Sequence, residues 1–317
     1  MATLSVMITA AVLFAWLFAI LLYERPSQGS VSIKTFIYPA ALALCLAGWL
    51  MPAHIHGMDT LISIHQAFLA VIATFLTSVW LISLITKDTS IMDIAYPLTA
   101  ALPTLWIVWN QGTWEPHEIL CLCLVMLWAI RLAGHIGLRN LPHGEDARYA
   151  AWRRRHGPHW WWWSLFQVFV LQGVMVSLWS IPLVFALDTS HSSLGWPHII
   201  ACGLFSIGFY FQAVADHQLE QFRRTRTRPD AVLNTGLWAL SRHPNYFGEA
   251  LIWWSFGFLG LTHPWGWLGL VAPAYVTWFM SQGSATPMQE RYLAKKKPGY
   301  DEYVATVPKF FPKLSRS

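Results

Sequence analysis

Long apolar stretches dominate the chain, and short polar segments separate them. A run of about 20 apolar residues is long enough to cross the hydrocarbon core of a bilayer as a helix. The sequence contains nine such runs, and each predicts a transmembrane helix. They lie at residues 4–23, 35–51, 61–85, 92–109, 118–138, 162–187, 197–215, 246–261 and 265–282. The eighth run is short for a full crossing and is also compatible with a half-span.

The composition agrees with this pattern. Of 317 residues, 55% are apolar and 12% are charged, whereas a soluble domain carries about 25% charged residues. A soluble fold with so few charges would expose more apolar surface than monomers tolerate, and the 20 tryptophans suit a border between lipid and water. We therefore expect an all-α integral membrane bundle of about nine transmembrane helices. A soluble enzyme and a nucleic-acid-binding domain are excluded, although the net charge is +5.

The basic residues predict the orientation of these helices. Cytoplasmic loops of membrane proteins are enriched in Lys and Arg. Here every second loop and the C-terminal tail carry all the basic residues except Arg131, which lies inside the fifth run. This alternation predicts an outer N-terminus and a cytoplasmic C-terminus. No basic residue precedes the first run and no small-residue cleavage site is present, so we expect a retained span rather than a signal peptide.

The first two runs differ from the later ones. Residues 1–60 contain two spans without an intramembrane acid or base, so we interpret them as an appended pair of helices and residues 61–317 as the functional domain. The four cysteines lie within apolar runs and lack a paired spacing, which is typical of small buried hydrophobic residues. The sequence predicts no metal site.

Three groups of polar residues lie where hydrophobicity does not explain them, and charged groups at membrane depth are usually functional. The first is on the fifth run, where Arg131, His135 and Arg139 share one helix face and Asn140 follows. The alternative interpretation is that Arg131 extends its side chain to the interface, which lies about 10 Å away along the helix.

The second group ends the seventh run. Asp216, Glu220 and Arg223 are spaced to share one helix face, and an arginine-rich segment follows at 223–228. A solvated run of charges would explain this segment. An acid just inside the membrane with arginines two turns later is also suited to hold a ribose hydroxyl and its phosphates.

The third group is the densest and extends from Ser241 to Glu249. His243 precedes a proline, which predicts that a helix begins at Pro244. Asn245 and Glu249 then lie on one face of that helix. A buried carboxylate requires a partner, and we expect Arg131 to be the partner of Glu249. The free amides at the helix start suit a phosphate group.

The residues at 237–249 (LWALSRHPNYFGE) closely resemble the signature of the membrane steroid 5-alpha-reductase-like superfamily. The resemblance extends through 144–149 (GEDARY), 213–219 (AVADHQL) and the tail at 290–312, and covers about residues 61–313. It is greatest for the uncharacterised bacterial branch. Sterol C14 reductases and isoprenylcysteine carboxyl methyltransferases share the Arg-His-Pro-Asn/Ser-Tyr pattern, so the pattern indicates the superfamily rather than the reaction.

The resemblance implies a seven-helix reductase-like core, preceded by the two additional helices, in a bacterial inner membrane. Such reductases bind NADPH between helices and cytoplasmic loops and reduce a double bond conjugated to a carbonyl. The substrate would be hydrophobic, sterol- or isoprenoid-like, and membrane lipid is the other expected partner. The cofactor-binding residues implied by the resemblance are Arg131, Arg139, Asn140, Asp216, Arg223, Arg242, His243, Asn245, Tyr246, Glu249 and Tyr292.

The sequence departs from the steroid reductases at the catalytic residues. Their Gln-Glu pair, which polarises the substrate carbonyl, has no counterpart at 90–97, and the position of their partner tyrosine falls near Trp128. Reduction of an enone requires a hydrogen-bond or proton donor at the carbonyl oxygen. Asp93 and Tyr96 are the nearest polar candidates and are our predicted catalytic residues.

Two other functions remain open at this level. One is an S-adenosylmethionine-dependent methyltransferase of a lipid or prenylated acceptor, although the arginines of 223–228 favour a phosphorylated cofactor. The other is a non-enzymatic lipid-binding or transport protein, because a shared fold does not imply a shared function. The sequence does not indicate the oligomeric state or the identity of the substrate.

Overall fold

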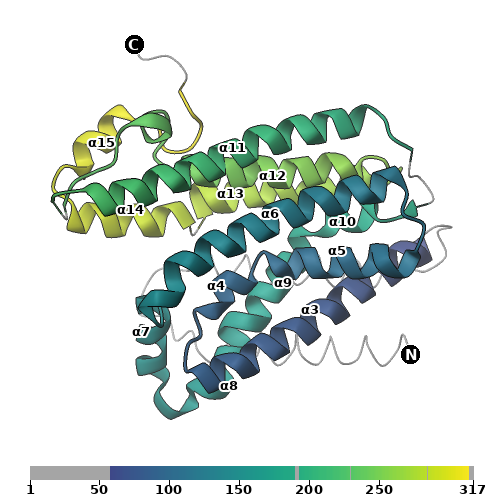
Figure 1. Cartoon of the computed structure of the whole chain (residues 1–317), viewed down its shortest axis with the longest axis horizontal. Helices are drawn as coiled ribbons and strands as arrows, with labels where there is room; N and C mark the ends of the chain where they lie inside the picture. Colours follow the sequence, from purple (N-terminus) through teal and green to yellow (C-terminus); the bar gives the residue numbers. More distant parts are fainter. Residues whose placement is uncertain (1–57, 190–192, 229, 284, 314–317) are drawn as a thin grey trace, which may run out of the picture. The chain divides into compact units, whose positions relative to one another are not determined.

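The computed structural model describes residues 58–189, 193–228, 230–283 and 285–313, and every regular element within these ranges is a helix (Figure 1). Five helical segments in these ranges are long and apolar enough to cross a membrane. They are Asp59–Thr86, Ile91–Gln111, Pro116–His143, Ala147–Trp179 and Trp196–Thr225. The predicted all-α, polytopic membrane fold is thus confirmed. The runs at 4–23 and 35–51, and with them nearly all of the appended pair, lie outside the described residues.

The sixth and ninth predicted runs do not form single α-helices. The sixth divides into α8 (Trp160–Ser164), a π-helical turn η3 (Leu165–Val170), α9 (Leu171–Trp179) and α10 (Ile181–Ala186). Pro182 begins α10, because proline suits the first turn of a helix and not its interior. The ninth run divides into η6 (Gly266–Leu270), α13 (Val271–Trp278) and a second π-helical turn η7 (Phe279–Gly283). The segment Ala147–Trp179, which is long and apolar enough to cross a membrane, covers residues 162–179 of the sixth run, and the chain turns at Ser180 before α10. Residues 266–283 of the ninth run are helical, with two changes of helix type.

The chain divides into two compact units. Among the described residues, the first comprises residues 58–103 and 132–178, and the second comprises those of 104–131 and 179–313. In the first unit, the long helix α3 (Met58–Thr86) packs against the π-helical turn η3. The other helices of this unit are α4 (Ile91–Ala95), α7 (Ala147–His156), α8 and α9. It also includes the start of α5 (Leu98–Gln111) and the end of α6 (Pro116–Asn140).

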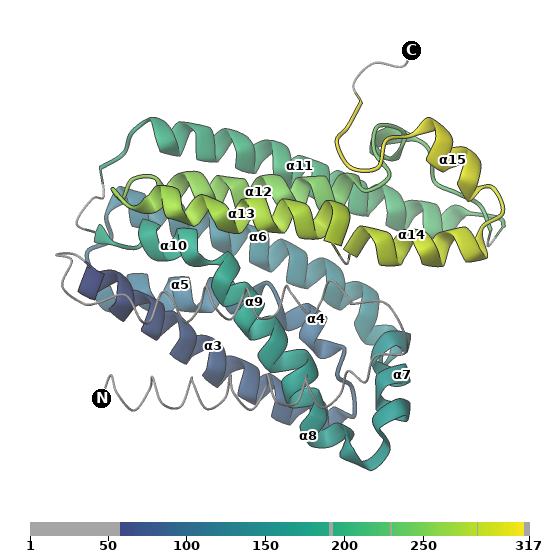
Figure 2. The same cartoon turned by 180° about the vertical axis from the view of Figure 1, so that it is seen from behind.

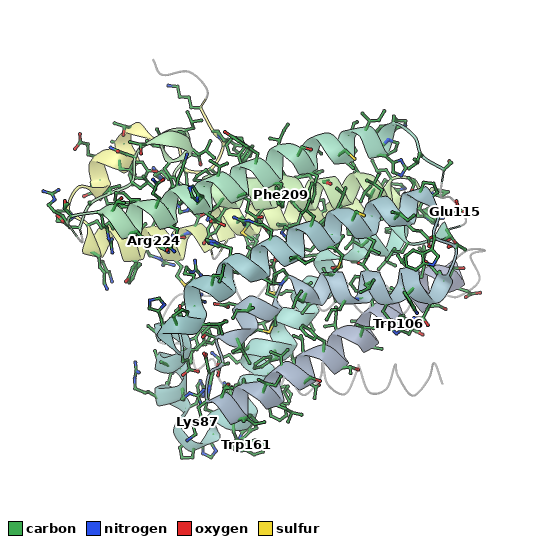
Figure 3. All side chains as sticks on the ribbon, in the orientation of Figure 1. Lys87, Trp106, Glu115, Trp161, Phe209 and Arg224 are labelled. Carbon is green, nitrogen blue, oxygen red and sulfur yellow. The ribbon has the colours of Figure 1, made fainter. Side chains whose placement is uncertain are left out.

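The second unit is built around a buried helix, α12 (Pro244–Gly260), which packs against α11 (Trp196–Thr225), α10 and α13. Figure 2 shows α12 and α13 side by side, with α14 (Ala285–Lys296) following α13. A short helix, α15 (Tyr300–Thr306), precedes the C-terminal segment. Apolar residues such as Phe209 lie along the middle of α11, and Arg224 lies near its C-terminal end (Figure 3). The predicted helix start at Pro244 is confirmed.

Two glycines allow α11 and α12 to approach each other closely. A Cβ atom added to Gly208 would lie 2.7 Å from the carbonyl oxygen of Gly248. A Cβ atom added to Gly248 would lie 2.5 Å from the carbonyl oxygen of Gly208 and 2.6 Å from the amide nitrogen of Gln212. Because glycine has no side chain, the two backbones can touch here. The close contact brings the polar residues on the facing turns of both helices within hydrogen-bond distance.

A chain of hydrogen bonds joins the starts of α6 and α11. The amide of Gly195 donates to His198 Nδ1 at 2.9 Å, so this nitrogen acts as an acceptor and Nε2 carries the proton. His198 Nε2 lies 2.6 Å from His117 Nδ1, and His117 Nε2 lies 2.5 Å from the carbonyl oxygen of Ala186 at the end of α10. The order of donors and acceptors is satisfied when both imidazoles are neutral. Buried polar groups at these helix ends therefore have partners.

Candidate functional site

An ion pair links α6 to α11 in the second unit. Arg131 Nη2 lies 2.8 Å from Asp216 Oδ2, and the two side chains are 16% and 9% exposed. The same nitrogen donates to the carbonyl oxygen of Gln212 at 3.1 Å. Asn245 on α12 donates from Nδ2 to the other Asp216 oxygen at 3.0 Å. Asp216 therefore joins three helices through one carboxylate, and this role requires a charged group at depth.

Glu249 is the centre of a second set of contacts on α12. Two indole groups, Trp128 Nε1 and Trp253 Nε1, each donate to the carboxylate at 3.0 Å. The side-chain amide of Gln212 donates to it as well. The expected partner of Glu249 was Arg131, but the hydrogen bonds from Arg131 go to Asp216 and to the Gln212 backbone. The position of Gln212 on α11, opposite Glu249, explains the difference. We call the two sets of contacts together the polar network; its seven side chains are Trp128, Arg131, Gln212, Asp216, Asn245, Glu249 and Trp253.

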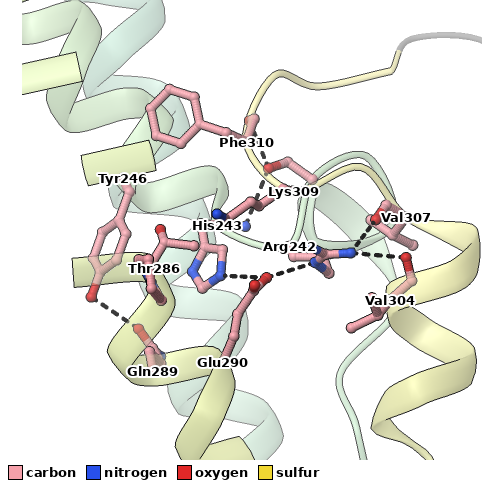
Figure 4. Close-up of polar contacts among 12 residues, drawn as sticks. Arg242, His243, Tyr246, Thr286, Gln289, Glu290, Val304, Val307, Lys309 and Phe310 are labelled. Carbon is pink, nitrogen blue, oxygen red and sulfur yellow. Dashed lines mark hydrogen bonds and ion pairs between the residues drawn. The ribbon is translucent and has the colours of Figure 1, made fainter. Parts of the chain in front are cut away.

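The segment before α12 is held by the C-terminal tail. Arg242 Nε donates to Glu290 Oε1 on α14 at 2.8 Å, and Nη1 donates to the carbonyl oxygens of Val304 and Val307 (Figure 4). His243 Nε2 lies 3.3 Å from the same Glu290 oxygen. Burial lowers the pKa of His243, although the hydrogen bond to Glu290 opposes this shift. Burial by itself raises the pKa of Glu290, but the hydrogen bond from His243 and the charge of Arg242 lower it below its usual value.

Next to this junction lies a cavity of about 500 Å³, within the range of small-molecule sites. Its walls come from the end of α11, the segment before α12, and helices α14 and α15. The described residues contribute five basic side chains and one acid, together with aromatic rings. The basic residues are Arg223, Arg226, Arg242, Lys296 and Lys297, the acid is Asp230, and the aromatic residues are Phe222, Trp238, Tyr292, Tyr300 and Tyr303. We call it the basic cavity.

The basic side chains of this cavity repel one another. Burial lowers the pKa of Lys297, and the nearby charges of Arg226 and Arg223 lower it further. The Lys297 ammonium donates to the carbonyl oxygen of Ala231, and it lies 5.7 Å from the centre of the Phe222 ring. A ligand that carries several negative charges would relieve this repulsion, because a nearby negative charge favours the protonated, positively charged form of Lys297. The residues present therefore fit a phosphorylated ligand with an aromatic base.

One tyrosine of the basic cavity has an unusual environment. The Tyr300 hydroxyl is buried and has no hydrogen-bond partner among the described residues. Burial raises the pKa of Tyr300 to about 12, with a further contribution from the charge of Glu290. Tyr303, by contrast, donates its hydroxyl to the carbonyl oxygen of Trp238 at 2.6 Å. Tyr300 is therefore an available hydrogen-bond donor in the wall of the basic cavity.

The predicted cofactor residues fall into four places. Arg223, Arg242 and Tyr292 line the basic cavity. Arg131, Asp216, Asn245 and Glu249 belong to the polar network. The ring of Tyr246 stacks on the ring of His243 with centroids 5.4 Å apart, and the Tyr246 hydroxyl donates to Gln289 Oε1 on α14 at 2.9 Å. Tyr246 and His243 therefore lie at the junction with the tail. Arg139 and Asn140 belong to the first unit, where Arg139 Nε donates to Asn140 Oδ1 at 2.9 Å.

The predicted catalytic residues also lie in the first unit. Asp93, on α4, accepts hydrogen bonds from the Tyr149 hydroxyl at 2.5 Å and from Arg148 Nη2 at 2.7 Å. Tyr96 follows the last residue of α4. Tyr149 is buried on α7, and the sequence identified it only as part of the GEDARY motif. The neighbouring Glu145 forms an ion pair with Arg153 at 2.7 Å, which fixes the loop before α7.

Sequence reasoning did not single out four of the important residues. Glu290, Lys296, Lys297 and Tyr300 lie in the tail, where the basic residues were interpreted as a signal of membrane orientation. The available signal was the acid at 290, which lies among basic residues within the tail segment that resembles the family. The spacing of charges along one helix gives no information on contacts between distant segments.

The fold and the site define a polytopic α-helical membrane protein with a basic, aromatic-lined cavity beside a buried polar network. The chain belongs to the DUF1295 family, which is described as a protein family of unknown function and whose sequence profile matches residues 79–307. This is the steroid 5-alpha-reductase-like family. An uncharacterised protein of Schizosaccharomyces pombe is 28% identical over 272 residues, which cover 75% of this chain and 76% of the yeast protein.

Proposed function

We propose that this protein is an NADPH-dependent oxidoreductase that acts on CH–CH groups within a membrane. Its substrate would carry a carbon–carbon double bond conjugated to a carbonyl in a hydrophobic, sterol- or isoprenoid-like molecule. The observation that carries the proposal is the basic cavity, which is lined by five cations, one of them paired with Glu290, and by a single acid, and which therefore favours a polyanionic ligand. The family supports it, because DUF1295 is steroid reductase-like. The cytoplasmic position of the cavity and a bacterial inner membrane remain part of the proposal.

Arg223, Arg226 and Lys297 would hold the phosphate groups of NADPH, since arginine and lysine are the residues that bind phosphate. Phe222, Trp238 and Tyr292 offer aromatic surface for the adenine and nicotinamide rings. When bound, the cofactor supplies the hydride that reduces the double bond.

The polar network would support the residues that line the cavity and would not itself contact the ligand. Asp216 and Asn245 bond to each other, and Glu249 is saturated by three N–H donors, so these residues fix α11 against α12. Arg223 lies two turns beyond Asp216 on the same helix, and its position depends on that packing. We propose that the network keeps the arginines of α11 oriented toward the ligand, consistent with the need for rigid support behind a binding site.

We propose that Asp93 and Tyr96 provide the hydrogen bond or proton at the carbonyl oxygen of the substrate. The Tyr149 hydroxyl joins them: it donates to Asp93, so the proton of this contact lies on Tyr149 and the Asp93 carboxylate orients it. Arg148 fixes the carboxylate of Asp93 from the other side. A positioned donor of this kind typically contributes 10²–10⁴-fold to a rate.

The test is a binding titration of the purified full-length protein in detergent, with NADPH fluorescence as the readout. We expect saturable binding, and about tenfold weaker binding in Arg223→Ala, because a charge-assisted hydrogen bond contributes about 1.5–3 kcal/mol. Arg154→Ala is the matched control, since Arg154 is an exposed arginine on α7 outside the basic cavity. Absence of NADPH binding would refute the proposal. Transfer of a labelled methyl group from S-adenosylmethionine to lipid would favour the methyltransferase, and lipid binding without either cofactor would favour a lipid carrier.

A further inference from the structure

Arg242 is a connector between the segment before α12 and the tail. It is 8% exposed, and its guanidinium donates to three acceptors that all belong to the tail. Two of these acceptors are the backbone carbonyls of Val304 and Val307, and the third is the Glu290 carboxylate (Figure 4). Glu290 is the member of this set that carries a charge opposite to Arg242, and the two side chains lie 2.8 Å apart.

Backbone contacts continue the same attachment. The amide of Arg242 donates to the carbonyl oxygen of Pro308 at 2.9 Å, and the amide of Lys313 donates to that of Leu240 at 2.9 Å. The Ser241 hydroxyl donates to the carbonyl oxygen of Phe310 at 2.8 Å. The tail is therefore bound along the whole segment before α12, and Glu290 bonds to two adjacent residues of that segment.

The tail is also one wall of the basic cavity. The tail, from α14 to α15, contributes a large part of the lining, including two of its cations and its three tyrosines. These are Lys296, Lys297, Tyr292, Tyr300 and Tyr303. The remaining wall comes from α11 and the segment after it. The cavity is complete only while the tail is docked, so a ligand that contacts both walls stabilises the docked state.

We propose that Glu290 is a positioning residue that couples docking of the C-terminal tail to occupancy of the basic cavity. The Glu290 carboxylate holds Arg242 and His243, and through them it keeps α14 in place to form the cavity wall. Ligand binding and tail docking then favour each other by the same factor, as linkage requires. The identity of the ligand rests on the proposed function, but attachment of the tail by Glu290 does not.

Hydrogen–deuterium exchange of the full-length protein in detergent tests both parts. Without nucleotide, the amides of residues 300–313 should exchange about tenfold faster in Glu290→Gln than in the wild type, because a charge-assisted hydrogen bond to Arg242 is lost. Glu302→Gln, an equivalent change at an exposed acid of α15, should leave the exchange unchanged. Glu290→Asp should restore part of the protection because it retains the charge. Equal exchange in wild type and Glu290→Gln would overturn the inference, whether or not NADPH binds.

The coupling is measured with NADPH and, separately, with inorganic pyrophosphate as probes. At a concentration 100 times its dissociation constant, a probe that binds only the docked state should slow exchange of the wild-type tail by about 100-fold. The apparent dissociation constant should rise in Glu290→Gln in proportion to the loss of docked protein. Protection by pyrophosphate but not by NADPH would refute the proposed function and retain the coupling. Binding of either probe without protection of the tail, or protection by neither, would overturn the coupling.

Discussion

Replacement of Asp216 by asparagine should destabilise the second unit strongly. The change preserves the shape of the side chain and an oxygen that can accept from Asn245, but it removes the charge opposite Arg131. The Arg131 side chain is 16% exposed, and its Nη1 atom is buried without a hydrogen-bond partner among the described residues, so the guanidinium depends on Asp216. Removal of one partner of a buried ion pair costs about 3–5 kcal/mol. Because the pair retains some exposure, we expect about 3 kcal/mol.

A double-mutant cycle separates the ion pair from other effects of the substitutions. Asp216→Asn, Arg131→Met and the double variant are unfolded with SDS in mixed micelles, and the free energy of unfolding is compared with that of the wild type. We expect a coupling energy of about 2 kcal/mol, within the usual range for residues in contact. Glu220→Gln is the control on the same helix: its pair with Arg224 is 2.8 Å long but exposed, and such pairs contribute about 0.3–0.5 kcal/mol. A coupling energy below about 0.5 kcal/mol would show that this reasoning is wrong.

Three further predictions concern the helix contact, the polar network and the tail. Gly248→Ala places a Cβ atom 2.5 Å from a backbone oxygen of α11 and should cost about 1–3 kcal/mol in unfolding experiments, whereas Gly203→Ala, with nothing within 4 Å, should not destabilise. Trp128→Phe leaves the buried Glu249 carboxylate with one donor fewer and should cost about 1–3 kcal/mol by the same assay; no change would contradict it. The pKa of Glu290 is lowered on folding, so its stabilisation is complete above the unfolded value of about 4.3 and disappears as the pH falls through the folded value. After correction for the pH dependence of intrinsic exchange, the protection of the tail amides should therefore fall at acidic pH in the wild type but not in Glu290→Gln.

The sequence predicted the long helices well, because uninterrupted apolar length is a local property. The runs at 61–85, 92–109, 118–138 and 197–215 all lie within helices that can cross a membrane. Within the sixth and ninth runs, the changes of helix type and the turn before α10 were not predictable, because apolar content does not reveal a π-helical turn or the effect of Pro182 on helix continuity. Helix type at these places depends on packing, which a pattern of hydrophobic residues does not record.

Polar residues inside apolar helices were a sound guide to the candidate site, but their partners were not predictable. Arg131 had two acids within reach on other spans, Asp216 and Glu249, and spacing along the chain does not distinguish them. The contact between Gly208 and Gly248 determines the choice, because it sets which turns of α11 and α12 face each other. The basic cavity was even less accessible, since half of it comes from a tail whose position depends on contacts such as that of Arg242 with Glu290.

The pairing between α11 and α12 also specifies their register. Gln212 bonds to Glu249 and Asp216 bonds to Asn245, so each pair joins an amide to a carboxylate, and both pairs are one turn apart on antiparallel helices. A shift of one helical turn would place Asp216 opposite Glu249, two acids with no amide between them. Like charges in a buried position repel strongly, so the shifted arrangement is excluded. The four side chains therefore oppose a shift in that direction and favour the observed register of the two helices.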